Sequence, residues 1–209
     1  GLEIENGAAQ IVAEEDITLL GLTALTDRAG NDLVVLSRSA DVLVGLAQVG
    51  RAEGHIDIQA PLGSIREADG PDADADVVGA SAYLKALLVI GSLSDPSLNL
   101  EFDVGSLEID AFDLNLNVVG DVVLDIAIQG QADVRATGTI TVERLIALGD
   151  QVTLDAGGSI LVDLLEVGDG GGTLTALAGG DIRETDATDT DADLRAGIVS
   201  LTAAGTIGG

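Results

Sequence analysis

A short phrase that recurs along the chain limits its fold more than any other feature. The phrase reads apolar-x-apolar-x-Ala, then two or three small residues, then Ile. It occurs as VTLDAGGSI (152–160), VSLTAAGTI (199–207), LTALAGGDI (174–182) and ADVRATGTI (132–140), with IDIQAPLGSI (56–65) as a looser copy. The last residues of the four closest copies, at 140, 160, 182 and 207, are 20, 22 and 25 residues apart. Repetition at a near-constant period of this size is typical of solenoid proteins.

Each phrase alternates strictly between apolar and polar positions. In VTLDA, Val152, Leu154 and Ala156 point one way, and Thr153 and Asp155 point the other way. A period of two is the pattern of a half-buried strand, and helical spacing fits these segments poorly. A meander or sandwich of hairpins also has short alternating strands, but it gives no reason for the same phrase to return at near-constant spacing.

We therefore predict an all-β fold, a parallel β-helix (β-solenoid) of about nine or ten turns with roughly 20 residues per turn. The unit is a strand of about five residues, a Gly-rich bend, a second short strand and a variable loop. Residues 93–131 are the least regular part, and we interpret them as shorter turns of the same coil. No linker composition appears, so residues 1–209 are expected to form a single domain.

A longer repeat contains the most acidic stretches. Residues 63–92 align without a gap with residues 180–209, and 13 of the 30 positions are identical. The identical residues include the Ile-Arg-Glu triplets at 65–67 and 182–184 and the Asp-rich runs that follow them. The two copies begin 117 residues apart, which is five or six turns of the predicted coil. They are expected to lie too far apart to form one site together.

The chain carries a net charge of −27 with only nine Lys and Arg residues. Nucleic-acid binding requires a basic surface and an anionic membrane repels such a charge, so both partners are excluded. There is no Cys, and no apolar run approaches the roughly 18 residues of a membrane span, so no membrane insertion is expected. Because the chain lacks Met and stops within a phrase at GTIGG, we expect it to be a segment of a longer protein.

The repeats at 152–160 and 174–209, with 56–92 as a second copy, resemble those of filamentous-haemagglutinin-like bacterial surface proteins. The resemblance implies a right-handed parallel β-helix within a very large secreted protein. It further implies an extracellular or cell-surface location and use as a stalk, filament or adhesin. No residue of this chain matches a known binding site of that family, so the host or neighbouring-cell ligand stays open.

The Asp runs are the first candidates for chemistry. On an extended strand, residues two apart point to the same side about 7 Å from each other, and Ca²⁺ prefers hard oxygen ligands of this kind. The spacing matches neither of the familiar calcium-loop patterns, and a solvated charged loop that prevents edge pairing is the alternative. No cofactor is required, and Ca²⁺ is the one that the sequence allows. The candidate ligands are Asp72, Asp74, Asp76, Asp189, Asp191 and Asp193.

Enzyme chemistry has little support in this sequence. His55 is the single histidine, and no nucleophile-elbow motif accompanies it. Sites that cleave sugars usually need aromatic platforms, yet the chain has three aromatic residues and a single lysine, Lys85. We therefore expect a structural protein that is not an enzyme, with a polysaccharide-active β-helix as the remote alternative. Neither terminus resembles a capping turn, so we expect either more coil on both sides in a longer parent protein or end-to-end stacking of subunits into a fibre. Lateral self-association into fibres is the further alternative.

Overall fold

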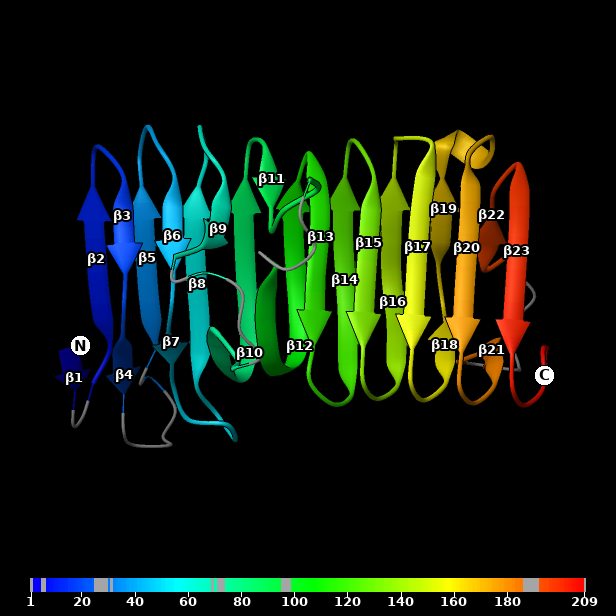
Figure 1. Ribbon diagram of the computed structural model, residues 1–209, viewed down its shortest axis with the longest axis horizontal. Coiled ribbons are helices and arrows are strands. Elements are labelled where there is room, and N and C mark those ends of the chain that lie inside the picture. The colour runs from blue at the N-terminus through cyan, green and yellow to red at the C-terminus, as the bar shows by residue number, and fades with distance from the viewer. Residues whose placement is uncertain are drawn as a thin grey trace.

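The computed structural model describes residues 2–4, 7–24, 30, 32–68, 70, 74–94, 99–185 and 192–208. All the strands in these residues pair in parallel, and they stack as a β-solenoid of about 8 turns with roughly 23 residues per turn (Figure 1). The predicted fold class is therefore confirmed. The turns are fewer and longer than predicted, because the turns before residue 114 hold 23 to 25 residues along one ladder, whereas the phrases that set the predicted period come mostly from shorter, later turns.

The strands form two broad faces that run in opposite directions (Figure 1). Face A follows the pairing order β2, β5, β8, β10, β12, β14, β16 and then the short strands β18, β19, β21 and β22. Their bounds are β2 (Ala9–Ala13), β5 (Leu33–Ser37), β8 (His55–Ala60), β10 (Val77–Ala86), β12 (Leu100–Ala111), β14 (Val122–Ile128), β16 (Ile140–Ala147), β18 (Ile160–Val162), β19 (Leu165–Val167), β21 (Ile182–Glu184) and β22 (Leu194–Arg195).

Face B follows the order β3, β6, β9, β11, β13, β15, β17, β20 and β23. A second set, β1, β4 and β7, extends its first turns, and a 3-10 turn, η2 (Gly168–Gly170), follows β19. The bounds are β1 (Leu2–Ile4), β3 (Ile17–Leu19), β4 (Leu22–Ala24), β6 (Val42–Val44), β7 (Ala47–Gln48), β9 (Ile65–Glu67), β11 (Val89–Ile90), β13 (Asp113–Val118), β15 (Ala132–Ala136), β17 (Gln151–Ala156), β20 (Thr173–Ala178) and β23 (Ile198–Ala203).

The two faces exchange roles along the rod. In the first turns face A has one unbroken strand per turn, while face B is divided into two short strands such as β3 and β4. In the last turns face B is unbroken, and face A is divided into β18 and β19 or β21 and β22. Strands β10 and β12 begin on face B and end on face A, because their first residues pair with different neighbours from their last residues.

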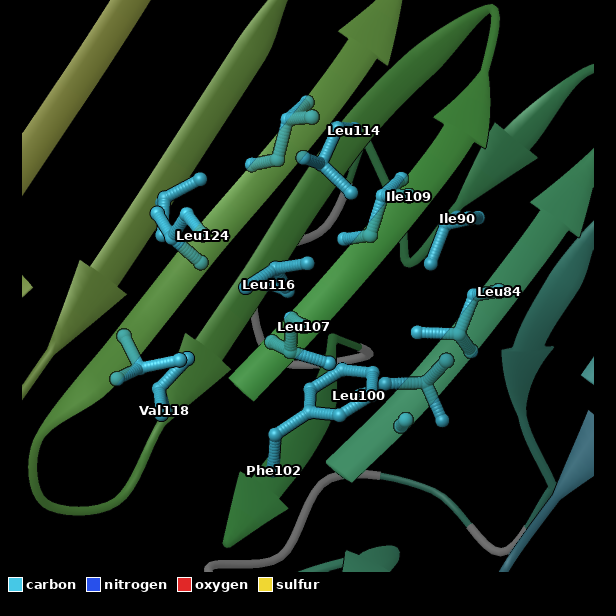
Figure 2. Close-up of a cluster of buried hydrophobic side chains, with 14 of the residues drawn as sticks. Leu84, Ile90, Leu100, Phe102, Leu107, Ile109, Leu114, Leu116, Val118 and Leu124 are labelled. Carbon is cyan, nitrogen blue, oxygen red and sulfur yellow. The ribbon is translucent and has the colours of Figure 1, made fainter. Parts of the chain in front are cut away.

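Apolar ladders fill the space between the faces. One ladder pairs equivalent residues eight times in succession, from Ile17 at one end to Val199 at the other. Its members are Ile17, Val42, Ile65, Ile90, Leu114, Ala132, Val152, Leu174 and Val199. Figure 2 shows leucine, isoleucine and valine side chains from neighbouring turns in one cluster with Phe102, which is fully buried. Burial of each such side chain stabilises the fold by about 1.5–3 kcal/mol, which explains the strict alternation of the phrases.

Several corners that precede a core Ile or Val contain a ladder of their own. The residue at such a corner is Asp, Ser or Thr, and its side-chain oxygen accepts the backbone N–H of the equivalent residue one turn later, whereas the corner before Ile90 holds Val89. At one corner Thr139 N–H donates to Asp121 Oδ1 at 2.7 Å, and Asp181 N–H donates to Ser159 Oγ at 3.0 Å. At the opposite corner Ser64 N–H donates to Asp41 Oδ1 at 2.8 Å. These bonds satisfy backbone groups where the strands end.

A buried amide network holds the turn where face B changes from divided to unbroken. Asn99 and Asn115 are buried, and Asn99 Nδ2 donates to Asn115 Oδ1 at 2.8 Å. Asn115 Nδ2 then donates to the carbonyl of Ser92 at 2.7 Å. A buried amide left without partners is destabilising, so these bonds hold Ser92, Asn99 and Asn115 together at the start of β12.

Candidate functional site

The long repeat is a repeat of whole structural elements. Strands β9, β10 and β11 of the first copy correspond to β21, then β22 with β23, and then Ile207 of the second copy. Ile65 pairs with Ile90, and Ile182 pairs with Ile207, so the same positions close each copy. However, β9 belongs to face B and β21 belongs to face A. The two copies therefore differ by a half turn, and the strands that precede their acidic segments lie on opposite faces.

The structure places the candidate calcium ligands in unlike surroundings. Asp76 is buried with 2% of its surface exposed, and its Oδ2 accepts the backbone N–H of Glu101 at 2.9 Å. Asp74 is exposed. The backbone carbonyl of Asp193 accepts a hydrogen bond from the N–H of Leu165 at 2.6 Å. Asp72, Asp189 and Asp191 lie outside the described residues. Among the residues that the structure describes, no group of three or more His, Asp or Glu side chains is placed to hold a metal ion.

The arginines of the two Ile-Arg-Glu triplets contact the corner residue two positions before them. Arg66 Nη2 donates to Ser64 Oγ at 3.1 Å, and Arg183 Nη1 lies 4.0 Å from Asp181 Oδ2. These contacts tie each arginine to the corner ladder, which is a structural role.

Each copy of the repeat has a hollow beside its Ile-Arg-Glu strand. The first has a volume of about 370 Å³ and is lined by Arg66, Glu67 and Gly91 among others. The second, of about 240 Å³, is lined by the equivalent Arg183, Glu184 and Gly208 and by apolar residues of the last turn. Both glycines have a positive φ, +82° and +95°, so the backbone bend repeats together with the side chains. The sequence repeat therefore encodes a repeated hollow as well as repeated strands.

A third hollow, of about 280 Å³, lies over face A and contains the single histidine. His55 Nδ1 lies 2.8 Å from Ser81 Oγ, the residue beside it on the next turn. The carboxylate that accepts a hydrogen bond from His55 does so from the backbone, because His55 N–H donates to Asp32 Oδ1 at 3.3 Å. A serine nucleophile needs a base that a further group orients, and the hydrogen bonds found here orient no such base. Separation by one 26-residue turn explains why sequence motifs did not indicate this pair.

Three of the six ion pairs among the described residues join a cation to a carboxylate of the adjacent turn. Lys85 Nζ contacts Asp110 Oδ2 at 2.6 Å, and Arg144 Nη2 contacts Asp125 Oδ1 at 2.7 Å. The hydrogen bond to Asp110 raises the pKa of Lys85, and burial raises the pKa of the neighbouring Tyr83. Both exposed ion pairs are worth about 0–1 kcal/mol each, so they adjust the surface rather than hold the coil together.

Comparison with protein-family models, curated proteins and solved structures gave no match to this chain. Within the described residues, no helix has the length and apolar character needed to cross a membrane. The function is therefore argued from the geometry of the rod.

Proposed function

We propose that this chain is a structural rod segment of a large bacterial surface or secreted protein, in which it serves as a stalk, filament or adhesin segment. The observation that carries the proposal is the apolar ladder that pairs equivalent residues eight times without interruption from Ile17 to Val199. A core of this kind extends along one axis instead of closing around one centre, so adding turns adds length.

The surface supports the same role. The outward positions carry most of the charge of −27, which keeps separate rods apart in dilute salt and attracts cations. The turns are joined by hydrogen bonds that lie along the axis, and the corner ladders add side-chain bonds in the same direction. The chain then acts as a mechanical spacer without catalytic activity of its own, and the repeat resemblance supports a location outside the cell.

Location and mechanics are tested separately. Antibodies raised against the purified chain should label intact cells of the source organism. Label that appears only after the cells are permeabilised contradicts the surface location.

For the mechanics, the chain is held at its two ends and stretched in optical tweezers. Each released turn of roughly 23 residues should lengthen the chain by about 75–80 Å at full extension. A single release of the whole chain, with no step near the length of one turn, contradicts a rod that yields turn by turn.

A further inference from the structure

Apolar side chains gather on one edge of the rod, where the chain passes from face A to face B. Of the thirteen large apolar side chains that are exposed among the described residues, five lie at this corner, with 47% to 59% of each exposed. All five lie in inner turns, with the turn of β5 before them and the turn of β19 after them. We call this surface the apolar edge. It consists of Leu62, Leu87, Leu88, Phe112 and Leu148.

Backbone hydrogen bonds along the rod axis stack these corners directly on one another. Leu88 N–H donates to the carbonyl of Gly63 at 3.1 Å, and Phe112 N–H donates to the carbonyl of Leu88 at 3.0 Å. Gln129 and Leu148 follow in the next two turns, and the N–H of each donates to a carbonyl of the turn before. Since successive turns are about 4.8 Å apart, the apolar edge is a row about 19 Å long, with the uncharged Gln129 as its one polar member.

The same corner is charged in the turns on either side of the apolar edge. Arg38 lies at this corner one turn before Leu62, and the exposed Asp169 lies there one turn after Leu148. The side chain of Arg38 contacts Glu14 and is still 57% exposed. Asp, Glu, Lys and Arg are absent from the corner segments between these two turns, which are residues 60–63, 86–89, 111–112, 128–131 and 147–149. On a chain with a net charge of −27, another acidic surface can approach this edge with little repulsion.

A second copy of the chain fits this edge. It offers a row of the same apolar side chains with the same spacing of about 4.8 Å, so each corner meets a corner. In an antiparallel arrangement with a two-fold axis at Phe112, Phe112 meets its counterpart, and Leu62 of each copy meets Leu148 of the other. At both ends of the row Arg38 then lies opposite Asp169 of the other copy. A parallel arrangement would instead set Arg38 against Arg38 and Asp169 against Asp169, so charge favours the antiparallel one.

We propose that two copies of this chain pair side by side and antiparallel along the apolar edge. The half-exposed side chains of the edge form an apolar patch of roughly a few hundred Å² per copy, the size that marks interaction sites on soluble proteins. Doubled across the two-fold axis, the contact stays below about 1,200 Å², in the class of weak and reversible interfaces. The inference extends the proposed rod function by giving the rod a lateral partner, but its test uses purified chain alone and is independent of cellular location.

Sedimentation equilibrium of the purified chain tests the pairing. At about 1 M NaCl, where the Debye length is about 3 Å, the unmodified chain should form dimers at protein concentrations up to about 1 mM. At about 0.01 M NaCl the dimer should be weaker by about tenfold or more, because the acidic rods, with Asp113 and Asp150 beside the edge, then repel each other. Phe112→Glu replaces the central apolar contact by two like charges and should weaken the dimer by about tenfold or more at either salt concentration.

The matched control is Val119→Glu. Val119 is also about half-exposed, but it lies between β13 and β14, at the opposite corner of the coil, so this variant should dimerise like the unmodified chain. Neither substitution removes a buried side chain. An unmodified chain that stays monomeric at about 1 mM protein and 1 M NaCl overturns the proposal. Equal association of the two variants also overturns it, as does growth beyond the dimer, because a two-fold contact closes.

Cysteine cross-linking reports the direction of the pairing. The chain has no Cys, so Leu62→Cys and Leu148→Cys each introduce a single thiol. In the antiparallel pair these two positions meet, whereas the two copies of residue 62 lie four turns, or about 19 Å, apart. A short bis-maleimide should therefore cross-link a mixture of the two variants several-fold more than Leu62→Cys alone. Equal or stronger cross-linking of Leu62→Cys alone overturns the antiparallel arrangement.

Discussion

At the scale of single residues, the corner ladder carries the clearest electrostatic signature. Asp181 accepts two hydrogen bonds from Thr206, first from the backbone N–H and then from the hydroxyl, and these hold the pKa of its carboxyl below the ordinary 3.8. A lowered pKa means that the folded state favours the carboxylate. The resulting stability of the last turn is present above the pKa of the unfolded chain and is lost as the pH falls through the lower folded value.

We therefore expect the Asp181 carboxyl to titrate below pH 3.8 in a carbon-detected NMR experiment. Thr206→Val removes the hydroxyl donor and keeps the backbone donor, so the pKa of Asp181 should rise part of the way toward the ordinary value. An Asp181 carboxyl that titrates above the ordinary value contradicts the corner bond.

A substitution at Asp76 distinguishes two roles for this carboxylate, a structural hydrogen-bond acceptor and a calcium ligand. Its hydrogen bond to Glu101 N–H is buried, so Asp76→Ala should lower the free energy of unfolding by about 1–3 kcal/mol in EDTA and in Ca²⁺ alike. The exposed Asp74→Ala is the control and should change it by less than about 0.5 kcal/mol. Urea unfolding of each variant in EDTA and in Ca²⁺ measures the change in the free energy of unfolding. A loss that appears only when Ca²⁺ is present would instead support the calcium hypothesis.

At the scale of the strand and its bend, glycine is required where corners stack closely. Gly158 N–H donates to the carbonyl of Gly138 at 2.8 Å, and a Cβ on Gly158 would lie 2.9 Å from the Gly138 carbonyl carbon. Gly158→Ala should therefore lower the free energy of unfolding by about 1–3 kcal/mol through overpacking. Gly171→Ala is the control, since its Cβ would have no neighbour nearer than 3.3 Å and its φ is −107°. Equal losses in the free energy of unfolding of the two variants, measured by thermal or urea unfolding, would contradict the close stacking of the corners.

The stability lost when a core side chain is truncated should depend on the turn in which that side chain lies. Leu154 has 0% of its surface exposed, between β15 and β20, whereas Leu201 in the last turn is only partly buried. We expect Leu154→Ala to cost about 2–5 kcal/mol, and Leu201→Ala clearly less, because the last turn already exposes its inward face. Equal losses in urea unfolding would show that the last turn is covered in solution.

The sequence predicted the strands well because alternation is a local property. Val152, Leu154 and Ala156 point inward as their parity indicated, and the isoleucines at 140, 160, 182 and 207 pair in series. The sequence did not predict which face a phrase occupies. The phrase at 56–65 runs from face A to face B, and the phrase at 174–182 runs from face B to face A. The same phrase forms the corner from face A to face B and the corner from face B to face A. The local sequence pattern therefore cannot show which of the two corners a given phrase forms.

The candidate sites were less predictable, since they depend on contacts between turns. His55 and Ser81 meet only because β8 and β10 pair in one particular register. The corner ladder did leave a signal in the sequence, an Asp, Ser or Thr directly before many of the core Ile and Val residues. This pattern can be interpreted only when it is known that these residues stack on one another in successive turns. The right-handed sense of the coil and its place in a longer protein stay predictions.

At the scale of the whole molecule, the central claim is a single coil whose length grows evenly with the number of turns. Thr18 and Ser200 point outward on face B and are eight pairings apart along it, and Thr153 is six pairings from Thr18. At about 4.8 Å per turn, the two separations are about 38 and 29 Å. The absence of Cys allows spin labels to be placed at these positions alone.

Pulsed electron–electron resonance between labels at residues 18 and 153, and then at residues 18 and 200, tests the claim most directly. The account predicts two narrow distance distributions, with the second longer than the first by about two turns, or about 10 Å. Equal distances, or a shorter distance to residue 200, would mean that the chain folds back on itself and would contradict the solenoid.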